Sequence, residues 1–130
     1  MTEDRYDTGM RVRREVLGDT HVDAATETAT PLTAPFQDLV TRYAWGEVWT
    51  RPGLDRRTRS AVTIGMLVAL GRFEELALHL RGGLRNGLEP EEIAEILIQT
   101  AIYCGMPAAN RAFSVAAEVL ATGSDPGGGS

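Results

Sequence analysis

Hydrophobic residues recur about every three to four positions along this chain, and no segment alternates strictly between apolar and polar side chains. This pattern predicts helices and no strands. A first helix is predicted over about residues 5–17, and a weaker second one over about 21–30. A third begins near Thr33, a residue type that caps helices, and ends before the turn at 51–53. Its spacing predicts an inner stripe of Phe36, Leu39, Val40, Tyr43, Ala44 and Val48.

The next two predicted helices carry long apolar segments. Asp55 is the predicted cap of the fourth helix, whose body over 61–70 is apolar on all sides and therefore predicts a buried central helix. Its first turn is rich in arginine, which the helix dipole disfavours, so we expect these arginines to have partners elsewhere. The fifth helix, over 74–85, ends at Asn86–Gly87, which is typical of a left-handed C-cap.

Proline marks the start of the last two helices, at Pro90 and Pro107. The last helix is predicted to reach about Thr122, and the small residues after it offer no apolar anchor. The pattern as a whole predicts an all-α protein, with one domain of about six to seven helices over residues 1–122 and a flexible tail over 123–130.

Composition narrows the classes of partner. The net charge of −5 gives no electrostatic support to a nucleic-acid partner, and all 13 basic residues are arginine. An anionic ligand would therefore need a local group of arginines. Cys104 is the single cysteine, which excludes an intrachain disulfide and a metal site built on a cysteine pair. The longest uncharged apolar run, 61–71, is too short to cross a bilayer, so we expect a cytoplasmic protein with no membrane partner.

The fifth predicted helix holds the first candidate for chemistry. His79 lies four residues after Glu75, so the two side chains share one face of the helix. Leu76, Leu80 and Leu84 form a neighbouring stripe, which places the histidine at the border of the core. This pair suits proton transfer. A partly buried histidine bonded to a backbone carbonyl, with no catalytic role, fits the same pattern.

Glu47 is the second candidate. It falls on the predicted apolar face of the third helix, where a carboxylate either pairs with an arginine or has a raised pKa. Both conditions occur at catalytic sites and in structural ion pairs. Trp45 and Trp49 flank it and could cover a pocket, an edge of the core or a subunit interface.

Further polar residues are candidates for substrate binding. Arg51 and Arg72 lie at helix ends near the candidates above, and arginine grips a carboxylate through two parallel hydrogen bonds. Tyr103 and Asn110 lie on either side of the predicted turn at 105–107 and could contact a substrate or serve the fold. The two histidines of the chain have no nearby set of ligands, so we predict no metal site.

One run of residues, RYAWGEVWTRPGLDRRTR over 42–59, is specific enough to indicate a family. It resembles the signature of the gamma-carboxymuconolactone decarboxylases. Other segments similar to the same family are 5–19, 74–79, 85–87 and 107–110, so the resemblance covers about residues 4–121. It implies the helical fold shared with alkylhydroperoxidase D proteins, assembled as a homo-oligomer, either a hexamer or a trimer.

Peroxidatic members of that superfamily carry a Cys-x-x-Cys motif followed four residues later by a histidine. Counted back from His79, the two cysteine positions hold Arg72 and Glu75. A thiol-dependent peroxidase is therefore excluded, and the decarboxylase branch is favoured.

The resemblance implies decarboxylation, without a cofactor, of the small anionic substrate 4-carboxymuconolactone to 3-oxoadipate enol-lactone and CO2, in the protocatechuate branch of the beta-ketoadipate pathway. We assign His79 as the proton donor or oxyanion partner, with Glu75 or Glu47 orienting it. Arg72 and Arg51 would hold the acetate carboxylate of the substrate. The other predicted substrate contacts are Trp45, Tyr103 and Asn110.

Two other interpretations stay open from the sequence. The first is a non-catalytic helical assembly module, which would have no small-molecule pocket lined by His79, Glu47 and arginines. The second is the same decarboxylase scaffold acting on a different lactone or beta-keto acid, because specificity depends on a few pocket contacts.

Overall fold

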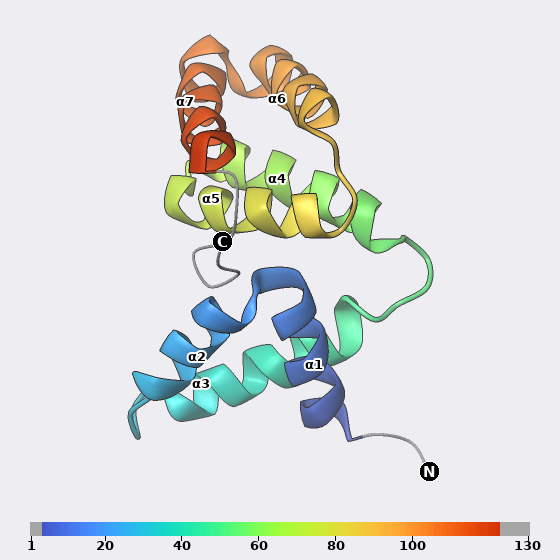
Figure 1. Cartoon of the computed structure of the whole chain (residues 1–130), viewed down its shortest axis with the longest axis vertical. Helices are drawn as coiled ribbons and strands as arrows, with labels where there is room; N and C mark the ends of the chain where they lie inside the picture. The colour runs from blue at the N-terminus through green and yellow to red at the C-terminus, as the bar shows by residue number, and fades with distance from the viewer. Residues whose placement is uncertain (1–3, 123–130) are drawn as a thin grey trace. The chain divides into compact units, whose positions relative to one another are not determined.

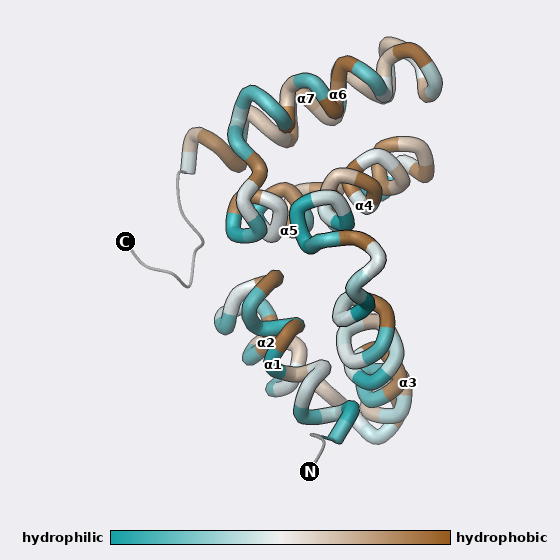
Figure 2. Tube along the Cα trace, turned by 90° about the vertical axis from the view of Figure 1, so that its right-hand side faces the viewer, coloured by the Kyte–Doolittle hydropathy of each residue, from teal (hydrophilic) through white to brown (hydrophobic). Residues whose placement is uncertain are grey.

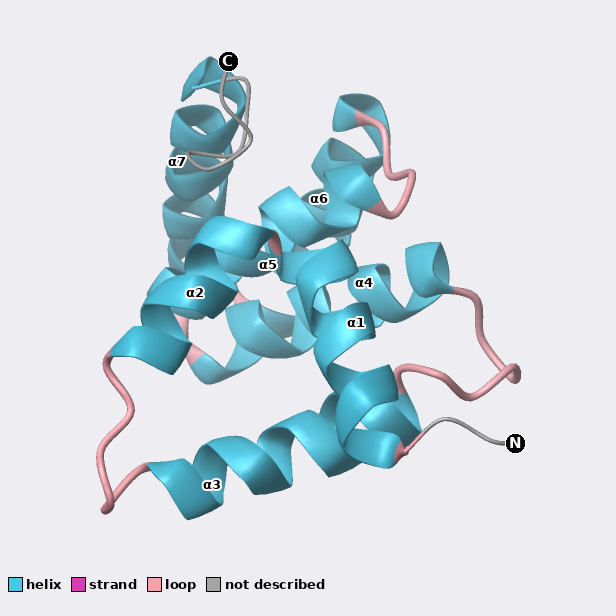
Figure 3. Cartoon of the chain, turned by 60° about the horizontal axis from the view of Figure 1, so that its bottom comes forward, coloured by secondary structure: helices cyan, strands magenta, loops and turns pink. Residues whose placement is uncertain are grey.

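The computed structural model describes residues 4–122, and every regular element among them is a helix (Figure 3). The elements are α1 (Arg5–Leu17), α2 (Asp19–Glu27), α3 (Ala34–Leu39), the π-helix η1 (Val40–Val48), α4 (Arg56–Leu70), α5 (Phe73–Arg85), α6 (Pro90–Cys104) and α7 (Met106–Thr122) (Figure 1). Hydrophobic and hydrophilic residues alternate in short bands along these helices (Figure 2), as expected where one face is buried. The all-α prediction is confirmed. The predicted flexible tail lies outside the described residues.

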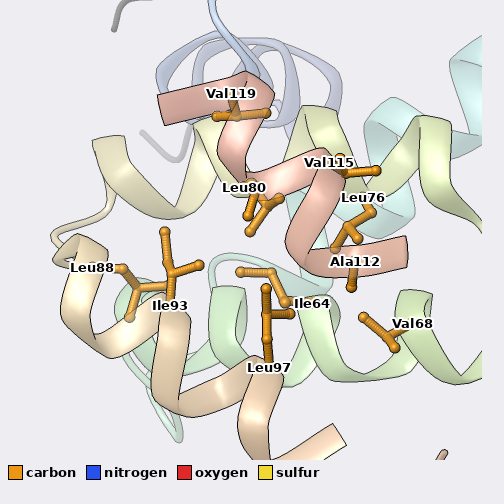
Figure 4. Close-up of a cluster of buried hydrophobic side chains, with 11 residues drawn as sticks. Ile64, Val68, Leu76, Leu80, Leu88, Ile93, Leu97, Ala112, Val115 and Val119 are labelled. Carbon is orange, nitrogen blue, oxygen red and sulfur yellow. The ribbon is translucent and has the colours of Figure 1, made fainter. Parts of the chain in front are cut away.

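Contacts between helices divide the described chain into two compact units, residues 4–54 and residues 55–122. In the second unit α4 packs beside α5 and α6 beside α7, and the two pairs contact each other (Figure 1). Eleven buried side chains form the core of this unit (Figure 4). They are Ile64, Val68, Leu76, Leu80, Leu88, Ile93, Leu97, Ala112, Val115, Ala116 and Val119.

The ends of α4 and α5 follow the predicted signals. The carboxylate of Asp55 accepts a hydrogen bond from the backbone N–H of Thr58, at 2.7 Å, and so caps α4. Arg57, in the first turn of α4, forms an ion pair with Glu92 of α6. This arginine therefore has a partner on another helix, as expected for a cation placed against the helix dipole. At the end of α5, Gly87 has a φ of +101°, a conformation that favours glycine.

The paired glycines of α5 serve close packing. Gly82 and Gly83 are both buried, and a Cβ atom added to Gly83 would lie 2.9 Å from Cδ1 of Leu88 and 3.5 Å from Cδ1 of Ile64. Glycine inside a helix costs about 1 kcal/mol relative to alanine. Here it allows α4 and the segment after α5 to approach the helix closely.

The prediction that 61–70 is buried on all sides is wrong for the single chain. Only Ser60, Ile64 and Val68 of α4 are buried, while Met66 is 53% and Leu70 67% exposed. The neighbours of α4 within the unit are α5, α6 and α7. They leave one apolar side of the helix uncovered, and the sequence pattern alone could not reveal this.

In the first unit α1 packs against η1 at a crossing between two glycines. A Cβ atom added to Gly9 would overlap the carbonyl oxygen of Thr41, and one added to Gly46 would lie 2.5 Å from the carbonyl oxygen of Arg5. The two backbones therefore touch directly. Any larger residue at either glycine would push the helices apart.

The predicted inner stripe of the third helix is wrong. Phe36 is 61% and Tyr43 56% exposed, whereas Thr41, Trp45 and Gly46 are buried. The prediction assumed an α-helix, but residues 40–48 form a π-helix, in which hydrogen bonds join residues five apart instead of four. The wider turn changes which side chains share a face within 40–48, whereas Phe36 belongs to the preceding α-helix α3, which buries no residue.

Candidate functional site

His79 lies in the middle of α5, on the edge of its buried face. Leu76 and Leu80 are both 0% exposed and fix the orientation of the helix against the core. The histidine is half-buried, and its Nδ1 atom is inaccessible to solvent. Solvent therefore reaches this residue at atoms other than Nδ1. Such a position, fixed on one side and accessible on another, suits a side chain that exchanges a proton with a ligand.

The beginning of α5 carries the other two candidates of the second unit. Glu75, one turn before His79, and Arg72, the N-cap residue, are both exposed. Gly71 has a φ of +70° and ends α4 in the left-handed conformation, so that the chain reverses directly into α5. This turn places a cation, an acid and a histidine along the first two turns of one helix.

The same face of α5 is held against α4 at its far end. Asn86 Nδ2 donates a hydrogen bond to Ser60 Oγ at 2.9 Å, and Ser60 is buried. This bond and the packing of Gly83 fix the spacing of α4 and α5 beside the candidate histidine. The helix that carries His79 is therefore a rigid support, which a catalytic side chain requires.

Glu47 belongs to the first unit and forms two ion pairs. Its carboxylate lies 3.2 Å from Nη2 of Arg5 and 3.8 Å from Nη1 of Arg51. Of the two states expected for Glu47, an ion pair with arginine or a raised pKa, the structure shows the ion pair. Arg5 was not foreseen as a partner. It reaches Glu47 because Gly46 lets the beginning of α1 approach η1 closely.

Trp45 is buried, with 5% of its surface exposed, and its ring stacks on that of Trp49. The centroids are 5.0 Å apart and the planes differ by 21°. An offset stack of this kind fixes both rings. Trp45 thus forms an apolar surface on the same element as Glu47 and close in sequence to Arg51.

Asn110 and Tyr103 lie on the last two helices. Asn110 lines an apolar groove of about 740 Å³ between α6 and α7, together with Ile98, Ile102 and Phe113. Tyr103 is 81% exposed. The predicted site residues therefore divide into Trp45, Glu47 and Arg51 in the first unit and Arg72, Glu75, His79, Tyr103 and Asn110 in the second.

A buried arginine escaped the sequence analysis. Arg13 is only 7% exposed and bonds to Thr41 and Gln37 in the first unit. The signal was present in the sequence, because Arg13 falls at the helical spacing of the buried residues Gly9, Val12 and Val16. Its position within this stripe therefore indicates burial, although its charge does not.

Over residues 4–122, no three or more histidine, cysteine, aspartate or glutamate side chains come together in a way that could hold a metal ion. Within the same range, no helix has the length and apolar character needed to cross a membrane.

Comparison with known proteins now gives the class and the family. Residues 34–118 match the carboxymuconolactone decarboxylase family. The chain is 48% identical over 118 residues to 4-carboxymuconolactone decarboxylase of Acinetobacter baylyi, which covers 91% of this chain and 88% of the relative. It is 44% identical over 115 residues to nitrosuccinic acid decarboxylase npaB of Metarhizium robertsii, covering 88% and 80%. A 4-carboxymuconolactone decarboxylase sequence of Pseudomonas putida is 51% identical over 43 residues, covering 33% and 90%.

These relatives are decarboxylases, and this all-helical chain is an enzyme of the same class, a carboxy-lyase. The chain belongs to the carboxymuconolactone decarboxylase family.

Proposed function

We propose that the enzyme converts 4-carboxymuconolactone to 3-oxoadipate enol-lactone and CO2, in the protocatechuate branch of the beta-ketoadipate pathway. The observation that carries this proposal is the 48% identity, over 91% of the chain, to the Acinetobacter baylyi enzyme of that name. The site elements α5 and η1 both lie inside the matched region.

The substrate supplies its own electron sink. Its leaving carboxylate is on the ring carbon next to the ring oxygen, so the electron pair released with CO2 flows through the ring alkene into the lactone carbonyl. The resulting 2-oxyfuran dienolate then takes one proton at the carbon alpha to the carbonyl. The protein has to stabilise the oxyanion and deliver that proton, and the reaction needs no cofactor as electron acceptor.

His79 is the residue to which we assign proton delivery or contact with the oxyanion. Its half-buried position on a fixed helix supports the assignment. Glu75, one turn earlier on the same face, or Glu47 would orient it. In this proposal Arg51 and Arg72 hold the acetate carboxylate.

The other proposed contacts concern the surroundings of the substrate. The buried ring of Trp45 would provide an apolar wall, which favours loss of charge from the departing carboxylate. Tyr103 and Asn110 would make polar contacts. Among the described residues that line the α6–α7 groove, Asn110 is the one polar residue.

The His79→Ala variant tests the catalytic assignment. Removal of a general acid typically costs 10²- to 10⁴-fold in rate, so we expect kcat to fall about 10³-fold. His21→Ala is the matched control, because His21 is the other histidine and is exposed on α2. A folded His79→Ala variant with turnover near that of the unchanged enzyme would contradict the assignment.

One relative favours a second candidate substrate. The Metarhizium robertsii relative is named for nitrosuccinic acid, a dicarboxylate whose nitro group can accept the electron pair released with CO2. Both reactions share a departing carboxylate, an internal electron sink and a second carboxylate. Parallel assays with the two substrates decide between them. A kcat/KM at least 10²-fold higher for 4-carboxymuconolactone is expected, and the reverse preference would move the proposal to nitrosuccinate.

We also propose that the chain forms a homo-oligomer, a hexamer or a trimer, through the exposed apolar side of the second unit. Ile102 is 69% and Met106 68% exposed beside the α6–α7 groove, and none of the residues lining the groove is charged. Sedimentation equilibrium should give a mass of three or six chains, and Ile102→Asp should lower it. A monomer at micromolar concentration would contradict this part of the proposal.

A further inference from the structure

The first unit contains a pocket that the reaction proposed above does not use. It has a volume of about 600 Å³, which is within the range of small-molecule sites, and it lies between α1, α2 and the α3–η1 helix. Its walls combine apolar side chains, from Met10 and from alanines and prolines, with polar and charged ones that include Arg13, Asp38 and Arg42. None of the residues to which we assign a role in decarboxylation lines it.

Arg13 lies in the wall of this pocket with 7% of its surface exposed. Its Nη1 donates to Thr41 Oγ1 at 3.2 Å, and its Nη2 donates to Gln37 Oε1 at 3.0 Å. Both acceptors are neutral. The Nε–H is buried and donates to no group in the described part of the chain.

The positive charge of Arg13 is uncompensated. No carboxylate among residues 4–122 pairs with it, and burial lowers the pKa of its guanidinium from the ordinary value. Burying a charge without a counter-ion is costly, and proteins rarely do so unless a ligand or partner supplies the opposite charge.

The other charges at the pocket do not supply it. Asp38 lines the pocket, but its carboxylate lies 2.9 Å from Nε of Arg42, which also pairs with Asp4 at 3.4 Å. Arg14, the next residue of α1, pairs with two aspartates of α2 and is not part of the lining. Arg13 is thus a buried cation that lines the pocket without a carboxylate partner among the described residues.

We propose that this pocket is a binding site for a small organic acid, with the ligand carboxylate on the Arg13 guanidinium and the hydrocarbon part against Met10 and its apolar neighbours. Arginine suits this task because each terminal nitrogen carries a second N–H besides the one that bonds Thr41 or Gln37, and parallel N–H groups match the two oxygens of a carboxylate. Thr41 and Gln37 hold the guanidinium in place from the side of η1 and α3.

The test uses benzoate as the probe and benzamide as its neutral analogue, titrated into the ¹⁵N-labelled full chain. The Nε–H resonance of Arg13, assigned by its loss in Arg13→Met, reports on this site alone and not on the decarboxylation site. We expect benzoate to shift it saturably and benzamide to bind at least tenfold more weakly. An unmoved resonance, or equal affinity for both probes, would overturn the proposal.

Two variants separate ligand binding from a purely structural role. Arg13→Met should lose benzoate binding at this pocket while its Tm stays equal or rises, because apolar replacement of a buried charge is often neutral or stabilising. Arg14→Met removes the same charge one residue away and should bind benzoate as the unchanged protein does.

Two results together would instead make Arg13 a structural contact between helices or between copies of the chain. Benzoate would leave the resonance unmoved in the unchanged protein, and Arg13→Met would lower the Tm or dissociate the oligomer. If Arg13→Met does not fold, Arg13→Lys assigns the resonance, and the benzoate–benzamide comparison in the unchanged protein decides alone.

Discussion

Different contacts hold the helices together inside each of the two units of this small protein. The second unit has a core of eleven buried apolar side chains from four helices and the segment between α5 and α6. The first unit joins α1 to η1 by direct backbone contact at Gly9 and Gly46 and by the buried polar group of Arg13 and Thr41. Hydrophobic burial is tolerant of small changes in side-chain shape, whereas backbone contact at a glycine is not.

The difference also concerns the surroundings of two residues to which we assign functions, His79 and Arg13. The candidate histidine lies on α5, which the fully buried Leu76 and Leu80 anchor in the core. The buried arginine lies on α1 beside the buried residues Val12 and Val16 and bonds to polar groups of α3 and η1. Variants of each unit should therefore differ in the size and the kind of their effects.

The largest effect is expected from Gly9→Ala. The added Cβ would overlap the carbonyl oxygen of Thr41, a backbone atom that cannot rotate away, so α1 must separate from η1. We expect a loss of about 4 kcal/mol or more in the free energy of unfolding, measured by urea denaturation. Gly53→Ala, in the same unit with no atom within 4 Å of the new Cβ, is the control. Equal stability of the two variants would show that the glycine crossing is not needed.

The next effect in size is expected from Leu80→Ala in the core of the second unit. Leu80 is 0% exposed, and its truncation leaves a cavity among large side chains that can collapse only in part. The expected loss is about 3 kcal/mol, with the cooperativity of unfolding retained. Leu32→Ala, at a leucine 87% exposed, should change stability by less than about 0.5 kcal/mol. Similar losses from both would contradict the assigned core.

Gly65→Ala should stabilise the protein, which is the opposite of the effect expected for Gly9→Ala. Gly65 lies inside α4, and no atom lies within 4 Å of a Cβ added there. Alanine restricts the unfolded chain and favours the helix, which gives about 1 kcal/mol. Calorimetry should show a higher Tm. A lower Tm would mean that this side of α4 is covered tightly in the assembled protein.

The smallest effect concerns the cap of α4. The backbone N–H of Thr58 lowers the pKa of Asp55 below its usual 3.8, so the charged cap stabilises the folded state above about pH 4 and loses that contribution as the pH falls through the lowered pKa. Asp55→Asn keeps a capping side chain but does not titrate. The stability difference between the two proteins should therefore shrink from pH 7 to pH 3. A difference independent of pH would contradict the cap.

Much of the fold could be predicted from local signals. Helix boundaries at Arg5, Asp55 and Pro90, and the buried faces of α5 and α6, follow from capping residues and 3.6-residue periodicity. The π-helix could not be predicted, since its hydrogen-bond spacing breaks that periodicity. The uncovered side of α4 could not be predicted either, because an apolar surface for other chains has the same composition as a core.

The candidate site was predictable only in part. An ion pair was one of two states expected for Glu47, but the apolar face from which it was expected is not buried; Arg51 pairs with Glu47 because it lies four residues later. The pairing with Arg5 depends on the approach of α1 to η1, which is a tertiary contact. Arg13 shows the limit most clearly, because its burial becomes evident only once Thr41 and Gln37 are seen beside it.

The most direct test of the proposed function is a turnover assay of the metal-stripped protein with 4-carboxymuconolactone, in which the loss of ultraviolet absorbance and the release of CO2 are followed together. If the proposed function is correct, the enzyme turns over rapidly without any added cofactor and releases one CO2 for each lactone consumed. An oligomeric, well-folded protein that leaves the lactone and its carboxylate intact would contradict the proposed substrate.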